Sequence, residues 1–343
     1  MQAARQPDFN QFLKVIRREK PDRPVLFEFI IAGEHLGRIS GKPWPTNAAP
    51  IVQLEHWIHG FADAGYDFAT LPCWWLGLMT FEGKERKKAL SVGMAHGGII
   101  TDWKSFEKYE WPDPEQGRDG VVNEAGKFAP EGTKLIIFGP NGVLENLIAL
   151  VGFEELCYLL EDDQHLVEEI VEQIGSRLLK YYEWLLEYDF VGAAIVNDDW
   201  GFNTQTFLDH ETMRRLITPW HRKIVQAIHK TGRPALLHSC GQLGALWEDI
   251  IEDLKFEGKH SYEDQILPVE KAYAQYGNRI AILGGIDVDF LCRSKPEAIY
   301  SRARKLIEQT NGCTGYALGS GNSIPYYVPA EGFDAMRRAA LEY

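Results

Sequence analysis

The sequence predicts an α/β protein whose parallel strands close into a (β/α)8 TIM barrel. Short apolar segments of the kind that are buried on both faces alternate with helical segments along the chain. There are eight such units, and 343 residues is a usual length for this barrel. An open doubly wound sheet is the alternative, but no glycine-rich phosphate motif follows an early strand.

Most expected strands are apolar runs that end at a polar residue or at a Gly or Pro break, and the one at 256–262 is weaker. The eight strands are expected at residues 23–31, 67–74, 134–140, 190–199, 233–240, 256–262, 279–287 and 314–321. The helices are expected at 51–64, 163–188, 211–231, 243–254, 268–276 and 294–312, with another from 143. Residues 77–130 do not fit the repeat, and β-like stretches such as 94–101 predict an antiparallel insertion after the second strand. The whole chain, 1–343, is expected to be one barrel domain.

Composition excludes several classes of protein. Lys and Arg number 36 against 49 Asp and Glu, and the net charge of −13 disfavours nucleic acid or an anionic membrane as a partner. The five cysteines are scattered and odd in number, as is usual in a reducing compartment. No apolar run reaches the roughly 18 residues of a membrane span, and the N-terminus has no signal-peptide pattern. A cytoplasmic location is therefore expected.

Polar residues gather where the expected strands end, and that edge of a barrel carries the active site. This pattern favours an enzyme over a binding scaffold. The residues singled out there are Glu28, Asn197, Asp198, Asp199, His238, Cys240, Glu263, Asp287 and Asn322. Trp74, Trp75 and Trp200 stand beside them and would shape an aromatic wall for a substrate ring if they face the mouth.

His238 and Cys240 stand two residues apart on one strand, so their side chains point to the same side. An imidazole and a thiolate on one face suit zinc, which would need a further ligand from another strand. Glu263 is the candidate for that ligand. A buried cysteine beside a hydrogen-bonded histidine is the alternative without metal.

Asp198 and Asp199 are adjacent at the end of a strand, so only one of them can point into the barrel. That carboxylate would orient a histidine or hold a substrate group, whereas the other would serve the loop or cap the next turn. The sequence leaves open which aspartate has which role.

Several motifs together resemble the uroporphyrinogen decarboxylase superfamily, strongly over residues 190–335 and faintly before them. The motifs are Asn197-Asp-Asp-Trp-Gly, Leu236-Leu-His-Ser-Cys-Gly, Leu283-Gly-Gly-Ile-Asp and Gly315-Tyr-Ala-Leu-Gly-Ser-Gly. The resemblance implies a TIM barrel and one of two chemistries: decarboxylation of uroporphyrinogen III, or methyl transfer to or from a corrinoid protein.

The decarboxylase branch carries Arg-Gln-Ala-Gly-Arg after the first strand, and its arginines bind substrate carboxylates. Residues 29–35 read Phe-Ile-Ile-Ala-Gly-Glu-His here, without either arginine. The catalytic Asp that this branch has after its second strand is also missing, because the matching residues 70–73 read Thr-Leu-Pro-Cys. A substrate with eight carboxylates needs such arginines, so true uroporphyrinogen decarboxylase activity is disfavoured.

The methyltransferase branch resembles the chain more closely. Its zinc ligands are a His-x-Cys pair, matched by His238 and Cys240, and a later Cys, where this chain has Asn322. The resemblance implies a methyltransferase that uses zinc, a small methylated substrate such as a methoxylated aromatic compound, and a corrinoid carried by a separate protein. A homodimer is left open. The alternatives are a decarboxylase of a porphyrinogen or small acid, and a non-catalytic ligand-binding barrel.

Overall fold

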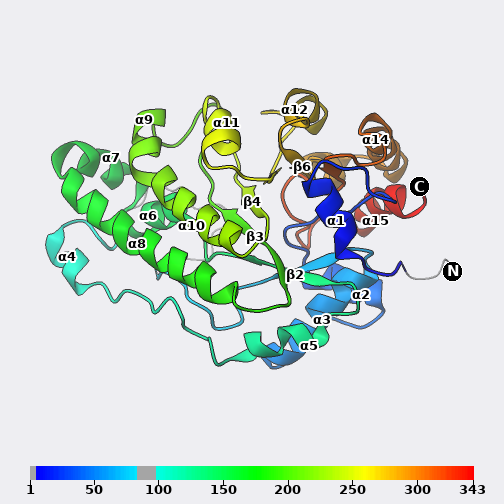
Figure 1. Ribbon diagram of the computed structural model, residues 1–343, viewed down its shortest axis with the longest axis horizontal. Helices are drawn as coiled ribbons and strands as arrows, with labels where there is room; N and C mark the ends of the chain where they lie inside the picture. The colour runs from blue at the N-terminus through cyan, green and yellow to red at the C-terminus, as the bar shows by residue number, and fades with distance from the viewer. Residues whose placement is uncertain (1–4, 83–97) are drawn as a thin grey trace.

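A curled sheet of seven parallel strands forms the centre of the computed structural model, which describes residues 5–82 and 98–343 (Figure 1). Each strand pairs with the next one along the chain. The strands are β1 (Phe68–Leu71), β2 (Lys134–Phe138), β3 (Val191–Asn197), β4 (Ala235–His238), β5 (Gly258–His260), β6 (Ala281–Leu283) and β7 (Tyr316–Ala317). Seven of the eight expected strands therefore form, each within its predicted range.

The first expected strand, residues 23–31, closes the sheet without forming a regular ladder. Leu26 bridges Leu318 in parallel, and the Phe27 N–H donates to the Leu318 carbonyl at 2.8 Å. On the other side, Thr70 Oγ1 of β1 donates to the Phe29 carbonyl at 2.8 Å. The segment thus lies between β7 and β1, and the architecture is consistent with a TIM-like barrel.

Helices cover the outside of the sheet. They are α1 (Phe9–Ile16), α2 (Gly33–Ser40), α3 (Pro50–Asp63), α6 (Val143–Val151), α7 (Phe153–Asp162), α8 (Gln164–Leu185), α9 (His210–Thr212), α10 (Thr218–Lys230), α11 (Leu246–Glu248), α12 (Val269–Tyr276), α13 (Val288–Arg293), α14 (Pro296–Gln309) and α15 (Ala330–Leu341). The long helices α8 and α10 pack side by side (Figure 1). The helix expected at 211–231 is interrupted by a π turn, Met213–Ile217, two residues before Pro219, which lacks a backbone donor.

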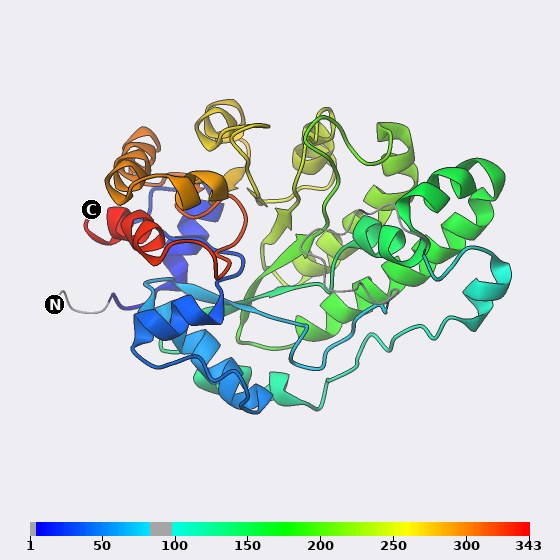
Figure 2. The same ribbon diagram turned by 180° about the vertical axis from the view of Figure 1, so that it is seen from behind.

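The two ends of the chain meet across the closure of the barrel. Arg38 of α2 forms an ion pair with Asp334 of α15 at 2.8 Å, and Arg337 Nε donates to the Ala64 carbonyl at 2.9 Å. Figure 2 accordingly shows α15, in red, over α2 and α3, in blue. These contacts hold the first and last segments of the chain together.

The antiparallel insertion expected at 77–130 is wrong for the residues that the structure describes. Residues 83–97 lie outside them, including the first half of the expected β-like stretch 94–101. The described remainder contains no strand; it forms the helices α4 (Trp103–Lys108) and α5 (Ala125–Phe128) and the 3-10 turn Val121–Glu124. Local β propensity without a neighbouring strand to pair with does not specify a sheet.

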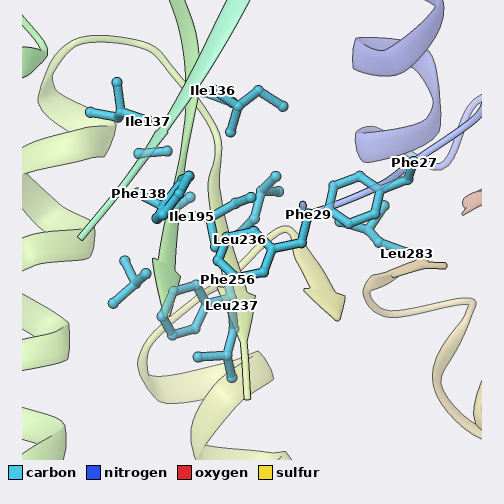
Figure 3. Close-up of a cluster of buried hydrophobic side chains, with 14 of the residues drawn as sticks. Phe27, Phe29, Ile136, Ile137, Phe138, Ile195, Leu236, Leu237, Phe256 and Leu283 are labelled. Carbon is cyan, nitrogen blue, oxygen red and sulfur yellow. The ribbon is translucent and has the colours of Figure 1, made fainter. Parts of the chain in front are cut away.

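The core lies inside the sheet and between the sheet and its helices. Phe27 and Phe29 from the closing segment pack near Leu236 and Leu283 of facing strands (Figure 3). β1 is fully buried, and β3 is buried except at one half-exposed glycine, as expected from the continuous apolar runs. In the described part of the chain, no helix has both the length and the apolar character to cross a membrane.

Candidate metal and active site

The carboxyl ends of β3, β4 and β5 bring three polar side chains into register. Asn197 pairs with His238, and His238 pairs with His260. Asn197 Oδ1 accepts a hydrogen bond from the Gly139 N–H at 2.9 Å, which ties the end of β3 to the loop after β2. Residues that follow these strands therefore meet at one edge of the barrel.

Asp199, His238 and Cys240 form a compact group at this edge. Their ligand-capable atoms all lie within 4.8 Å of one another. His238 Nε2 is 3.8 Å from Cys240 Sγ and 3.9 Å from Asp199 Oδ1, and the Cys240 N–H donates to Asp199 Oδ1 at 2.8 Å. One nitrogen, one sulfur and one oxygen donor are the ligand types that zinc takes, and three protein ligands leave a position for substrate.

The partly buried Cys240 thiol is surrounded by polar neighbours. Asn322 Nδ2 donates to Cys240 Sγ at 3.3 Å, and Ser261 Oγ lies 3.2 Å from the same sulfur. Burial, with the nearby Asp199 carboxylate, holds the pKa of the thiol well above its ordinary value. The thiolate that a metal requires therefore needs a cation beside it, and the donor set fits a zinc ion.

His238 is a neutral imidazole. Burial, followed by the charge of Lys259, lowers its pKa to about 3. Its ring lies 4.3 Å from that of Phe29 and cannot swing freely. A neutral imidazole has one unprotonated nitrogen, which is the form that ligates metals.

The two adjacent aspartates have separate environments. Asp198 is fully buried and accepts the N–H groups of Leu144 at 3.0 Å and Glu145 at 2.9 Å, in the first turn of α6. The Trp200 indole donates to it at 3.1 Å, and His221 Nε2 lies 3.2 Å away. Asp198 is thus turned toward the scaffold, and Asp199 is the one in the group with His238 and Cys240.

A cavity of about 740 Å³ opens beside this group. Asn322, which contacts Cys240, lines it together with the predicted residues Glu263 and Asp287. Asp287 caps α13, accepting the N–H of Asp289 at 2.7 Å, and also accepts the N–H of Asp264 at 2.8 Å. Glu263 lies outside the group of three potential ligands, so its predicted role as third ligand has no support from the geometry.

The three tryptophans do not form the expected wall. Trp200 is fully buried, with its ring edge-on to His221 at 5.0 Å. Trp74 is 49% exposed and packs on Phe138 at 5.6 Å, and Trp75 packs on Trp57. The aromatic residues that line the cavity are instead Tyr262, Phe290 and Tyr327.

Sequence reasoning missed two features of the strand 256–262. Lys259 is buried, its ammonium donates to the Ser261 carbonyl and lies 4.4 Å from the centre of the Tyr262 ring, and burial lowers its pKa to about 8. His260 is the second, because its Nδ1 lies 2.8 Å from Nδ1 of His238. The available signal was a lysine two residues before Ser261 in a segment that must form a buried barrel strand.

Fold and site together define a TIM-like barrel of the kind that carries an active site at the carboxyl ends of its strands. Residues 9–343 match the uroporphyrinogen decarboxylase (URO-D) family model, so the chain belongs to that family, as the resemblance predicted. Enzymes of this superfamily include methyltransferases and decarboxylases.

Two relatives represent these two activities. A methylated-thiol–coenzyme M methyltransferase of Methanosarcina mazei is 30% identical over 140 residues, which are 40% of this chain and 35% of that protein. A uroporphyrinogen decarboxylase of Methylococcus capsulatus is 24% identical over 194 residues, which are 56% of this chain and 53% of that protein. The matches thus span about a third to a half of the length of these relatives.

Among solved structures, a methyltransferase from Methanosarcina mazei superposes with a TM-score of 0.72 at 18% identity, covering 97% of both chains. This likeness establishes that the fold is shared along the chain.

Proposed function

We propose that this protein is a methyltransferase that moves a methyl group between a small methylated substrate and a corrinoid carried by a separate protein. The observation that carries the proposal is the group of Asp199, His238 and Cys240 beside a cavity large enough for a small substrate. The relative with 30% identity, a methylated-thiol methyltransferase, supports it and suggests methylated thiols as the first substrates to test.

The three residues would hold a zinc ion, with Asp199 as third ligand in place of the later cysteine of the methyltransferase branch. Bound zinc supplies Lewis-acid polarisation of the heteroatom that carries the methyl group. Asn322 donates to Cys240 Sγ, so a thiolate there would keep a hydrogen bond. Glu263 and Asp287 line the cavity and would orient polar groups of the substrate.

The charge of the cavity argues against a porphyrinogen substrate. Among the described residues, its lining has four carboxylates and one arginine: Glu263, Asp264, Asp287, Asp289 and Arg293. That arginine is paired with Asp289 at 2.5 Å. A polycarboxylate would meet repulsion rather than the cationic partners that it needs.

The test uses purified protein loaded with zinc and incubated with methylcobalamin and thiol acceptors, coenzyme M included. Demethylation of methylcobalamin is followed by its visible absorbance, and bound zinc is measured on the same samples. We expect Cys240→Ser to lose zinc affinity by about 100-fold or more, because replacing even a hydrogen-bond partner of a zinc ligand lowers metal affinity by about 10–100-fold.

Cys157→Ser is the matched control, because Cys157 is exposed on α7. Equal demethylation by the wild type and Cys240→Ser would overturn the proposal. Release of carbon dioxide and coproporphyrinogen from uroporphyrinogen III would favour the decarboxylase instead. Ligand binding without either reaction would favour a non-catalytic barrel.

A further inference from the structure

A row of buried, hydrogen-bonded groups extends behind His238, away from Asp199 and Cys240. His238 Nδ1 lies 2.8 Å from His260 Nδ1, and His260 Nε2 lies 3.2 Å from the Ser320 carbonyl oxygen. Ser320 in turn donates its N–H to Glu28 Oε1 at 2.7 Å and its hydroxyl to Glu28 Oε2 at 2.6 Å. All four residues are buried, so no water competes for these bonds.

The carbonyl at the far end fixes the direction of the bonds in this row. A carbonyl oxygen only accepts, so His260 Nε2 carries the proton and donates to Ser320. Both imidazoles are buried, and among the described residues neither has a carboxylate within hydrogen-bond distance to stabilise a positive charge, so both rings are neutral. A neutral His260 with a protonated Nε2 has an unprotonated Nδ1, which must accept from His238 Nδ1.

The same reasoning assigns the protonation of the other ring nitrogen of His238. With its proton on Nδ1, a neutral His238 presents an unprotonated Nε2, and this atom lies 3.8 Å from Cys240 Sγ and 3.9 Å from Asp199 Oδ1. We propose that His260 is a positioning residue, which accepts the Nδ1 proton of His238 and thereby holds its Nε2 lone pair toward the metal group. The metal at this group rests on the proposed function, whereas the tautomer of His238 does not.

Packing holds the two rings in this relation. Phe27 lies edge-on to His260 at 5.1 Å, and Phe29 covers His238. Gly284 leaves the room that the contact between His260 and Ser320 needs. A Cβ at that position would lie 2.2 Å from the Ser320 oxygen and 2.9 Å from His260 Cδ2.

The first test reads the tautomer directly in the metal-free wild-type chain. The protein is labelled with 15N-histidine, and the His238 signals are assigned by their loss in His238→Gln. We expect a protonated, pyrrole-type Nδ1 and an unprotonated, pyridine-type Nε2. A pyridine-type Nδ1 in His238 would overturn the assignment.

The second test measures zinc affinity by competition with a chromophoric chelator. His260→Leu removes the acceptor, and we expect a loss of about 10–100-fold, as is typical for partners of metal-bound histidines. His260→Asn keeps a carbonyl oxygen near the position of Nδ1 and should recover most of that loss. His229→Leu is the control, because His229 pairs with Glu257 at the opposite ends of the strands.

Circular dichroism would first establish that each variant is folded. Unchanged zinc affinity in folded His260→Leu would refute the positioning role, even if methyl transfer by the wild type establishes the proposed function. The expected wild-type tautomer without zinc binding in any sample would uphold the assignment and refute the zinc-assisted function. The two failures are therefore distinguishable.

Discussion

Replacing Asp198 by alanine would remove the acceptor that joins the end of β3 to the start of α6. Three N–H donors lose their partner: the backbone groups of Leu144 and Glu145 and the indole of Trp200, all at 2.9–3.1 Å. At about 1 kcal/mol for each bond, and more where a donor stays buried without a partner, we expect the free energy of unfolding to fall by about 3–5 kcal/mol.

Asp199→Ala is the matched comparison. The Asp199 side chain is 37% exposed and accepts one backbone N–H, that of Cys240, so its loss should cost about 1 kcal/mol or less. Zinc affinity should change in the opposite order, falling in Asp199→Ala and persisting in Asp198→Ala wherever that variant is folded.

Urea unfolding followed by circular dichroism measures the first quantity, and chelator competition measures the second. The reasoning would be refuted if Asp198→Ala unfolds within about 1 kcal/mol of the wild type, well below the sum of its lost hydrogen bonds. It would also be refuted if Asp199→Ala proves the less stable of the two variants.

Two further predictions concern other carboxylates of the mouth. Burial raises the pKa of Glu28 from 4.5 to about 8. Between these pH values the folded chain holds a proton that the unfolded chain has lost, so the free energy of unfolding falls as the pH rises. Glu28→Gln should therefore gain stability relative to the wild type from pH 4.5 to 8 in urea unfolding, and a constant difference would contradict the buried neutral carboxyl. Glu263→Gln should still bind zinc, because Glu263 lies outside the group of three potential ligands. Loss of zinc from this variant, measured by metal analysis, would show that Glu263 is a ligand.

The sequence determined the architecture because most of the strands are short and predominantly apolar. A segment without an alternating polar face must be covered on both sides, and eight such segments with intervening helices have few other arrangements. The first expected strand is confirmed only in part, because it forms isolated bridges to Leu318 and Ile324 rather than a regular ladder. The predicted antiparallel insertion was wrong for the described residues, because pairing partners for β-like stretches cannot be identified from local sequence.

The pairing of His238 with Cys240 was also within reach of the sequence, because side chains two residues apart on a strand share a side. The same alternation separated Asp198 from Asp199, but it did not say which one faces the mouth. That choice depends on α6, whose first turn offers Asp198 two N–H donors from residues more than fifty positions away.

Contacts between distant strands were decided by the tertiary structure alone. Asn322 reaches Cys240, and Ser320 reaches both His260 and Glu28, because barrel closure brings the last loop beside the first strand. Sequence patterns report which face of its own element a residue occupies. Distances between elements depend on how the sheet curls and closes, and for this reason the ligand-capable group and the row of hydrogen bonds behind it emerge only in the folded chain.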